Sequence, residues 1–406
     1  MINSGHALHR RACLFLSRLW LAAMSRQAVV VAVIAGLLLA GVWYGATRGP
    51  NPVEIVPPGR GDVAAIDGYV GAVVCMECHA DIARAYRTSG HAHTFHATND
   101  SQPARQLANV TFDDPQRKRP FRYHFDREGL SVSLPDQFGD EQFPLMYAVG
   151  SGTHAVTFLT LLPHRDGGVV GLEHRATLYS QLHGLGLTVG HRYLAAPVED
   201  AEHFGKVLDR QKLTECIGCH TTHAKLNRHE ITELIPHVGC EKCHGPGHDH
   251  VAARRAGRPG PEFSPARRWP SALDEIRTCG ACHRMPETLK PSELTRGSRV
   301  LPRFQPAGLM QSLCFTRSKG ELRCTTCHDP HAKTSTDTAA YERVCQSCHQ
   351  RQSVQACPKG ATGCVACHMP PVAFEEVAAF HDHWIRVRNS PEDPEPAVVG
   401  ETGEPK

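Results

Sequence analysis

The sequence predicts a mainly α-helical fold with much irregular loop, a small β-rich insert and one N-terminal transmembrane helix. Three observations lead to this prediction. A five-residue motif, C-x-x-C-H, recurs seven times in the 406 residues. An apolar run of 19 residues, Ala28–Ala46, lies near the N-terminus. A stretch without cysteine, from about Val110 to Ala195, alternates apolar and polar residues in short runs that are typical of strands.

The run Ala28–Ala46 has the length and character of a transmembrane helix. At about 1.5 Å of rise per residue it is long enough to cross a hydrocarbon core of about 30 Å. Arginines precede it, so the positive-inside rule places residues 1–27 in the cytoplasm and the rest of the chain outside. A cleaved signal peptide is the alternative, although the run is longer than an ordinary signal-peptide core. The prediction is therefore a protein on the periplasmic side of a bacterial inner membrane, anchored by this helix, in an oxidising compartment.

Composition and motif positions divide the chain into segments with different properties. Residues after the apolar run are rich in Pro and Gly, and the last residues are rich in Pro and Glu, which is typical of disorder. The predicted segments are a cytoplasmic arm (1–27), the anchor or uncleaved signal (28–46), a linker (47–70), a first motif-bearing segment (71–106), the β-rich insert (107–200), a segment with six motifs (201–389) and a disordered tail (390–406).

The recurring motif accounts for 14 of the 17 cysteines, and its chemistry is that of covalent haem attachment. Two thiols at positions i and i+3 lie on one side of a helical turn, where they can form thioethers to the vinyl groups of one haem. The adjacent histidine then binds the iron, so the motif is the attachment signal of c-type haem. Zinc sites, redox C-x-x-C pairs and disulfide frameworks do not explain a histidine after every pair. The sequence therefore predicts seven haem c groups, stacked closely enough to replace much of the usual side-chain core.

The cysteines predicted to form thioethers are Cys75, Cys78, Cys216, Cys219, Cys240, Cys243, Cys279, Cys282, Cys324, Cys327, Cys345, Cys348, Cys364 and Cys367. The histidines predicted to bind iron on the proximal side are His79, His220, His244, His283, His328, His349 and His368.

The histidines outside the motifs are candidates for the second axial position of each iron. Methionine is the other common ligand of cytochromes c, but the chain has only seven Met and 27 His. Coordination by two histidines is therefore the simplest interpretation for most haems. His331 follows His328 too closely to reach the opposite side of the same iron, so it would serve a neighbouring haem. The same argument applies to His223 after His220, and His250 follows a Gly-Pro-Gly turn that redirects the chain.

Several segments resemble the multihaem c-type cytochromes related to hydroxylamine oxidoreductase and to its tetrahaem electron-acceptor cytochrome. They are YVGAVVCMECH with SGHA, VGSGTHAVTFL, CEKCHGPGHDHV, LRCTTCHDPHA with VCQSCH, and GCVACHMPP with FHDHWIRV, between about Gly68 and Arg388. The C-x-x-C-K motif of the related nitrite reductases is absent, so the resemblance does not carry that activity. The resemblance implies distal ligation by His91, His154, His250, His331 and His383. His191 and His223 would complete a set of seven, and His96 and His381 are the neighbours that would replace a member of it.

Two further cysteines, Cys314 and Cys357, lie outside the motifs in the exported part of the chain. Two spare thiols in an oxidising compartment predict a disulfide between them. The alternative is that Cys314 binds an iron.

These patterns leave two functions open. The first is electron transfer through closely spaced haems between periplasmic or membrane redox partners. The second is an oxidoreductase that acts on a small nitrogen or sulfur compound at one haem with an open distal site. A net charge of only +3 gives no reason to expect a nucleic-acid partner. A homo-oligomer is compatible with either function.

Overall fold

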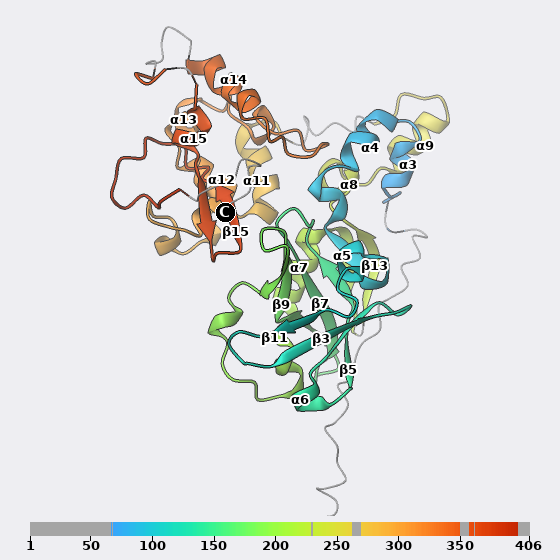
Figure 1. Ribbon diagram of the computed structural model, residues 1–406. Coiled ribbons are helices and arrows are strands. Elements are labelled where there is room, and N and C mark those ends of the chain that lie inside the picture. The colour runs from blue at the N-terminus through green and yellow to red at the C-terminus, as the bar shows by residue number, and fades with distance from the viewer. Residues whose placement is uncertain are drawn as a thin grey trace, which may run out of the picture. The chain divides into compact units, whose positions relative to one another are not determined.

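The computed structural model describes residues 66, 68–228, 230–261, 269–349, 357–360 and 362–396. Described residues form fifteen strands in four sheets, together with short α-helices and 3-10 helices (Figure 1). The strands are concentrated between the first and second C-x-x-C-H motifs. The motifs themselves lie on helices or turns.

The largest sheet has seven strands, with the central order β1-β6-β7-β8-β11 and with β9 and β10 extending from β7. All its pairings are antiparallel. Its strands are β1 (Phe95–Ala97), β6 (Tyr147–Val149), β7 (Ala155–Pro163), β8 (Val169–His174), β9 (Ala176–Tyr179), β10 (Gly184–Leu187) and β11 (Gly205–Leu208). A second, four-stranded sheet contains β2 (Thr111–Asp113), β3 (Pro120–Phe125), β4 (Leu130–Ser133) and β5 (Gln142–Leu145).

Strand β7 is buried on both faces, which explains its nearly continuous apolar sequence. Phe158 packs into one cluster of buried residues, with Tyr123 and Val132 of the four-stranded sheet. Leu159 and Leu161 point into a second cluster, which includes residues of the helix that carries the second motif. The β-rich region therefore has an ordinary side-chain core of its own.

The motifs fold on short helices or turns, and five of these helices end at the motif histidine. The elements are α3 (Ala72–Met76), α7 (Arg210–His220), α8 (Cys240–His244), α11 (Ala272–His283), η8 (Cys324–Thr326), α14 (Thr338–His349) and α15 (Cys364–His368). Helices α3 and α8 lie beside α4 (Ala80–Tyr86) and α9 (His248–Arg255) in Figure 1.

The remaining elements connect these parts. The other α-helices are α5 (Gln102–Arg105), α6 (Pro135–Phe138), α12 (Gln305–Met310) and α13 (Leu313–Arg317). The 3-10 helices are η1 (Gly90–His93), η2 (Thr98–Asp100), η3 (His191–Tyr193), η4 (Asp200–His203), η5 (Pro286–Thr288), η6 (Pro291–Glu293) and η7 (Leu301–Arg303). Two hairpins are formed by β12 (Thr221–Leu226) with β13 (Ile231–Pro236), and by β14 (Pro371–Phe374) with β15 (Ala378–His381).

The prediction of a mainly α-helical fold was wrong, because strands form a large part of the structure. The sheet extends beyond the predicted β-rich insert, since β1 and β11 lie outside residues 107–200. Two further hairpins lie in the motif-bearing region: β12–β13 lies between the second and third motifs, and β14–β15 follows the seventh. Short strands of four to six residues carry too little periodicity to be separated from helix or loop by sequence pattern alone.

The predicted transmembrane helix Ala28–Ala46 lies outside the described residues. Within the described ranges, no helix has both the length and the apolar character that crossing a bilayer requires. The prediction of a fold with an N-terminal span, and of a protein anchored by it at the inner membrane, is therefore withdrawn.

Candidate haem-binding sites

Each C-x-x-C-H motif forms a helical turn that brings its three functional side chains together. This holds even for the two motifs whose histidine lies outside an α-helix or 3-10 helix. The His79 N–H donates to the carbonyl of Cys75 at 2.9 Å, and the His328 N–H donates to the carbonyl of Cys324 at 3.0 Å. A donor set of two thiols and an imidazole on one turn fits the attachment of a haem with one axial ligand.

Four motif histidines face a second histidine from a distant part of the chain. An imidazole nitrogen binds a metal at about 2 Å and the ring centroid lies roughly 1 Å further away, so two imidazoles on opposite sides of one metal have centroids roughly 6 Å apart. The four pairs have centroid separations close to this value: His79–His250 (6.5 Å), His283–His91 (6.3 Å), His244–His331 (6.2 Å) and His328–His383 (6.2 Å). The spacing is that expected for residues that hold an iron between them.

Desolvation by the surrounding chain lowers the pKa of several of these rings, which favours the neutral form that binds metal ions. Desolvation, with the nearby His283, lowers the pKa of His91. Desolvation likewise lowers the pKa of His283 and lowers that of His383 to about 4. At neutral pH these imidazoles are therefore uncharged and able to donate a lone pair.

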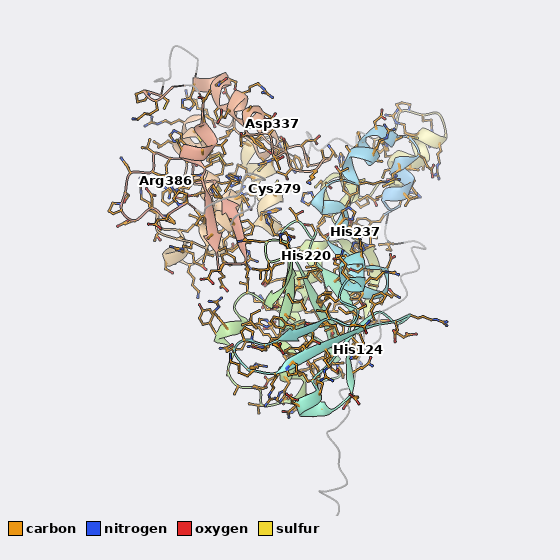
Figure 2. All side chains as sticks on the ribbon, viewed as in Figure 1. His124, His220, His237, Cys279, Asp337 and Arg386 are labelled. Carbon is orange, nitrogen blue, oxygen red and sulfur yellow. The ribbon has the colours of Figure 1, made fainter. Side chains whose placement is uncertain are left out.

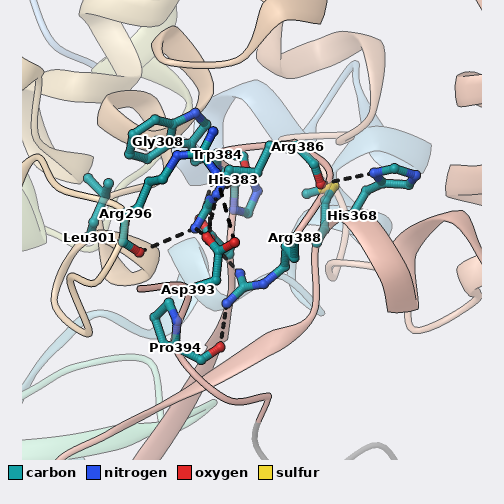
Figure 3. Close-up of polar contacts among 12 residues, drawn as sticks. Arg296, Leu301, Gly308, His368, His383, Trp384, Arg386, Arg388, Asp393 and Pro394 are labelled. Carbon is teal, nitrogen blue, oxygen red and sulfur yellow. Dashed lines mark hydrogen bonds and ion pairs between the residues drawn. The ribbon is translucent and has the colours of Figure 1, made fainter. Parts of the chain in front are cut away.

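Hydrogen bonds from the C-terminal segment orient the histidine of the seventh motif (Figure 3). The His368 Nδ1–H donates to the carbonyl oxygen of Arg386 at 2.9 Å, which leaves Nε2 for a ligand. The Arg386 guanidinium donates to the carboxylates of Asp382 and Asp393, each at 2.7 Å. Because Asp382 immediately precedes His383, this network lies beside two histidines that the sequence predicts to bind iron.

The other three predicted distal ligands do not face a motif histidine. The ring of His154 contacts Phe380 at 4.8 Å. The buried His191 has its Nε2 at 3.1 Å from a carboxylate oxygen of Glu173. His223 contacts the ring of Tyr69 at 4.8 Å, and its Nε2 lies 3.4 Å from a carboxylate oxygen of Glu233.

The two substitute candidates also have other contacts. His96 lies 6.3 Å from His93 and 4.5 Å from His237, measured between ring centroids. His381 Nδ1–H donates to the carbonyl of Met369 at 2.6 Å. His237, which the sequence pattern did not single out, is half-buried in this histidine cluster, and desolvation together with His96 and His93 lowers its pKa to about 4. No local sequence signal distinguishes His237 from a surface histidine.

Three motif histidines, His220, His349 and His368, have no ring contact with another imidazole of the described residues. His220 is half-buried, and its Nδ1 has no hydrogen-bond partner among them (Figure 2 shows its position). Burial lowers the pKa of His220, so this ring too is neutral.

Cysteines of different motifs lie next to each other. Three thiol pairs are hydrogen-bond partners: Cys75 with Cys240, Cys219 with Cys282, and Cys279 with Cys324. Three further pairs are close enough to interact electrostatically: Cys243 with Cys282, Cys327 with Cys345, and Cys345 with Cys364. Together these contacts connect all seven motifs in one series.

Cys314 and Cys357 form no disulfide in the structure, contrary to the prediction. The thiol of Cys314 interacts with the motif cysteine Cys348, whereas Cys357 interacts with Cys364. Cys314 lies in helix α13, and its thiol also interacts with Cys327 of the fifth motif and Cys345 of the sixth, the segment to which the sequence assigned it.

Comparisons with known proteins agree with the chemistry of the motifs. The family described as "Cytochrome c554 and c-prime" matches residues 195–245, which include helices α7 and α8 and therefore the second and third motifs. The solved structure "Crystal Structure of Outer Cell Wall Cytochrome OcwA" is similar over 79% of this chain and 80% of that chain, with 13% identity and a TM-score of 0.45. No curated protein sequence matches the chain. The family match, together with the repeated motif, supports a multihaem c-type cytochrome with covalently bound haem c.

Proposed function

We propose that the protein is a heptahaem cytochrome that transfers electrons through closely spaced haems, most of them held by two histidines. The observation that carries this proposal is the set of four histidine pairs, each made of one motif histidine and one distant histidine. When bound, haem iron supplies a one-electron redox couple. The paired histidines would hold a haem iron between them and leave no position for a substrate, which favours electron transfer over substrate binding.

The series of neighbouring motifs supports transfer from one haem to the next. Thiols that are hydrogen-bond partners join motif 1 to 3, 2 to 4 and 4 to 5, and thiols that interact electrostatically join motif 3 to 4, 5 to 6 and 6 to 7. A continuous series of this kind is what conduction between an electron donor and an electron acceptor requires. We therefore propose redox proteins, not nucleic acids, as partners. We also propose kinship with the cytochromes related to hydroxylamine oxidoreductase, on the sequence segments quoted above.

Replacement of a distal histidine tests the proposal. In His250→Ala the facing imidazole of His79 loses its partner, and we expect one haem to change from low spin to high spin in low-temperature electron paramagnetic resonance of the oxidised protein. His331→Ala should do the same for the haem of His244. The control is His248→Ala, two residues from His250 on the same helix, whose Nδ1 lies 3.1 Å from an Asp249 carboxylate oxygen.

Haem content, measured in parallel, should be seven per chain in all variants. Spin states unchanged in both His250→Ala and His331→Ala would contradict the assignment of these residues as ligands. A haem content well below seven would contradict the heptahaem proposal.

The second candidate function is an oxidoreductase, favoured by one observation. The half-buried His220 makes no ring contact with another imidazole among the described residues. His283, which helps to lower the pKa of His220, already pairs with His91, so the iron that His220 would bind has no histidine assigned to its other side. An open axial position of this kind admits a small nitrogen or sulfur compound. A stoichiometric high-spin signal in the unmodified protein that shifts on addition of nitrite or hydroxylamine would support this function over simple electron transfer.

A further inference from the structure

A buried carboxylate inside the third motif holds the segment that begins the first motif. Glu241, between Cys240 and Cys243, is 3% exposed. One of its oxygens accepts the N–H of Val70 at 3.0 Å and that of Gly247 at 2.8 Å, and the other accepts the N–H of Gly71 at 2.8 Å. Gly71 is the residue from which helix α3, with the first motif, begins.

The same arrangement occurs between the fourth and fifth motifs. Glu275, on α11 one turn before Cys279, is 2% exposed. Its carboxylate accepts the backbone N–H of Thr325 at 2.8 Å and the Thr325 hydroxyl at 3.1 Å, and Arg323 lies 3.6 Å away. Thr325 is inside the fifth motif, between Cys324 and Cys327.

The two glutamates join those motifs whose thiols are also in contact. Glu241 joins the motifs of Cys75 and Cys240, and the thiols of these two residues are hydrogen-bond partners. Glu275 joins the motifs of Cys279 and Cys324, whose thiols are likewise partners. The carboxylates and the thiols are independent observations, and both place one haem-binding motif directly against another.

Burial of a carboxylate costs free energy of desolvation, and hydrogen bonds from backbone N–H groups offset much of that cost. The acceptor-only pattern around Glu241 is that of an ionised carboxylate. A fixed negative charge stabilises a nearby ferric iron relative to the ferrous form, because ferric iron carries one more positive charge. The reduction potential of that iron is thereby lowered, and the effect is stronger in a buried site than in water.

We propose that Glu241 and Glu275 are positioning residues that fix the spacing of two pairs of haem-binding motifs and lower the reduction potentials of the haems at them. This inference rests on the proposed electron-transfer function. Glu241 acts on the first and third motifs, and Glu275 acts on the fourth and fifth. Neither glutamate touches iron; each acts through the backbone of a motif and through its charge.

The test compares Glu241→Gln and Glu275→Gln with the unmodified protein in a potentiometric titration followed by optical and electron paramagnetic resonance spectra. Glutamine keeps the size of the side chain but removes the charge. We expect at least one haem midpoint in each variant to shift to a more positive potential, with altered magnetic coupling between the two haems concerned. The control is Glu215→Gln, since Glu215 directly precedes Cys216 but is exposed and paired with Lys212.

Thr325→Val separates charge from positioning, because it removes the hydroxyl bond to Glu275 and leaves the carboxylate in place. We expect it to change the coupling between the haems of the fourth and fifth motifs more than their midpoints. If Glu241→Gln does not accumulate as folded protein, the midpoints of Glu275→Gln test the inference, because this second substitution disturbs fewer hydrogen bonds. Wild-type midpoints in Glu275→Gln, or an equal shift in Glu215→Gln, would overturn the inference. A low haem content in the unmodified protein would instead refute the proposed function itself.

Discussion

The imidazole of His174 is buried in the β-rich region and satisfied on both nitrogens. Nδ1–H donates to the carbonyl of Phe204 at 2.8 Å, so Nε2 accepts from the hydroxyl of Tyr123 at 2.7 Å. Burial lowers the pKa of His174 to about 3. The ring is therefore neutral in the folded protein over the physiological pH range, and its role is structural.

We expect acid to destabilise the fold through His174. In the unfolded chain this ring titrates near its ordinary pKa of about 6.5, so the unfolded state takes up the proton first. The free energy of unfolding then falls as the pH decreases from about 6.5 to about 3, by roughly 4 kcal/mol for this residue. Denaturant titrations at pH 7 and pH 4 measure the change.

The matched variants are His174→Gln and His164→Gln. His174→Gln should lose less stability between the two pH values than the unmodified protein, because the titrating group is gone. His164, which is half exposed and bound to Asp166, serves as the surface control, and its replacement should alter the pH dependence much less than that of His174. An identical loss in all three proteins would show that His174 does not titrate as described.

Residue spacing identified the haem-attachment motifs but only part of their surroundings. A thiol pair and a histidine on one helical turn are local, so the sequence determines their geometry. The facing histidine comes from elsewhere in the chain: His283 faces His91, and His328 faces His383. His191 was a candidate by sequence, yet a carboxylate of Glu173 lies beside it. Only the tertiary fold shows which histidines lie opposite a motif histidine and which contact other groups.

At the scale of elements, a network of buried charges holds the segment that follows β15. Asp382 is 2% exposed and accepts hydrogen bonds from Arg386 and Arg388, each at 2.7 Å. One of its oxygens also accepts the N–H of Trp384 at 2.9 Å. When the charge of a buried carboxylate is removed, the groups that donate hydrogen bonds to it lose their acceptor.

We expect Asp382→Asn to lower the free energy of unfolding by roughly 3–5 kcal/mol, the range for breaking a buried ion pair. The hydrogen bond from His368 to the Arg386 carbonyl should weaken in parallel, which optical spectra of the corresponding haem would report. Asp337→Asn is the control, since Asp337 is an exposed partner of Arg343 at 3.8 Å (Figure 2). Its loss should cost less than about 1 kcal/mol. Equal effects of the two substitutions would contradict the role of the network.

The sequence anticipated strands in the cysteine-free stretch but not how far the sheets extend. Alternating segments such as Pro120–Phe125 show one buried face in the structure, as their pattern predicts. Hairpins such as β12–β13 were missed because β12 is mostly polar and neither strand alternates between buried and exposed residues. Their pairing depends on tertiary contacts, which a short sequence window does not contain.

At the scale of the whole molecule, buried side chains are distributed unevenly. The β-rich region contains two large clusters of buried apolar residues. The cluster around Ile276 is much smaller. Helix α14 has twelve residues and none of them is buried, and α3 likewise buries none. Helices α3 and α14 therefore depend on something other than side-chain packing, as attached haem would provide.

We expect removal of haem to loosen these helices and to leave the β-rich region folded. Hydrogen exchange followed by mass spectrometry can compare the protein produced with and without haem attachment. Amides of β3, β7 and β8 should remain protected in both forms, whereas amides of α14 should lose protection without haem. Protection of α14 in haem-free protein would show that the helix is stable by itself.

The pairing of motifs that are distant in sequence has a consequence for biogenesis. Glu241 accepts hydrogen bonds from residues that precede it by 171 and 170 positions. During synthesis from the N-terminus, the segment of the first motif therefore emerges long before its partner exists. Contacts of such long range form late in folding. The first motif therefore stays without its contact to Glu241 until the third motif has been synthesised, which leaves its thiols open to cofactor attachment in that interval.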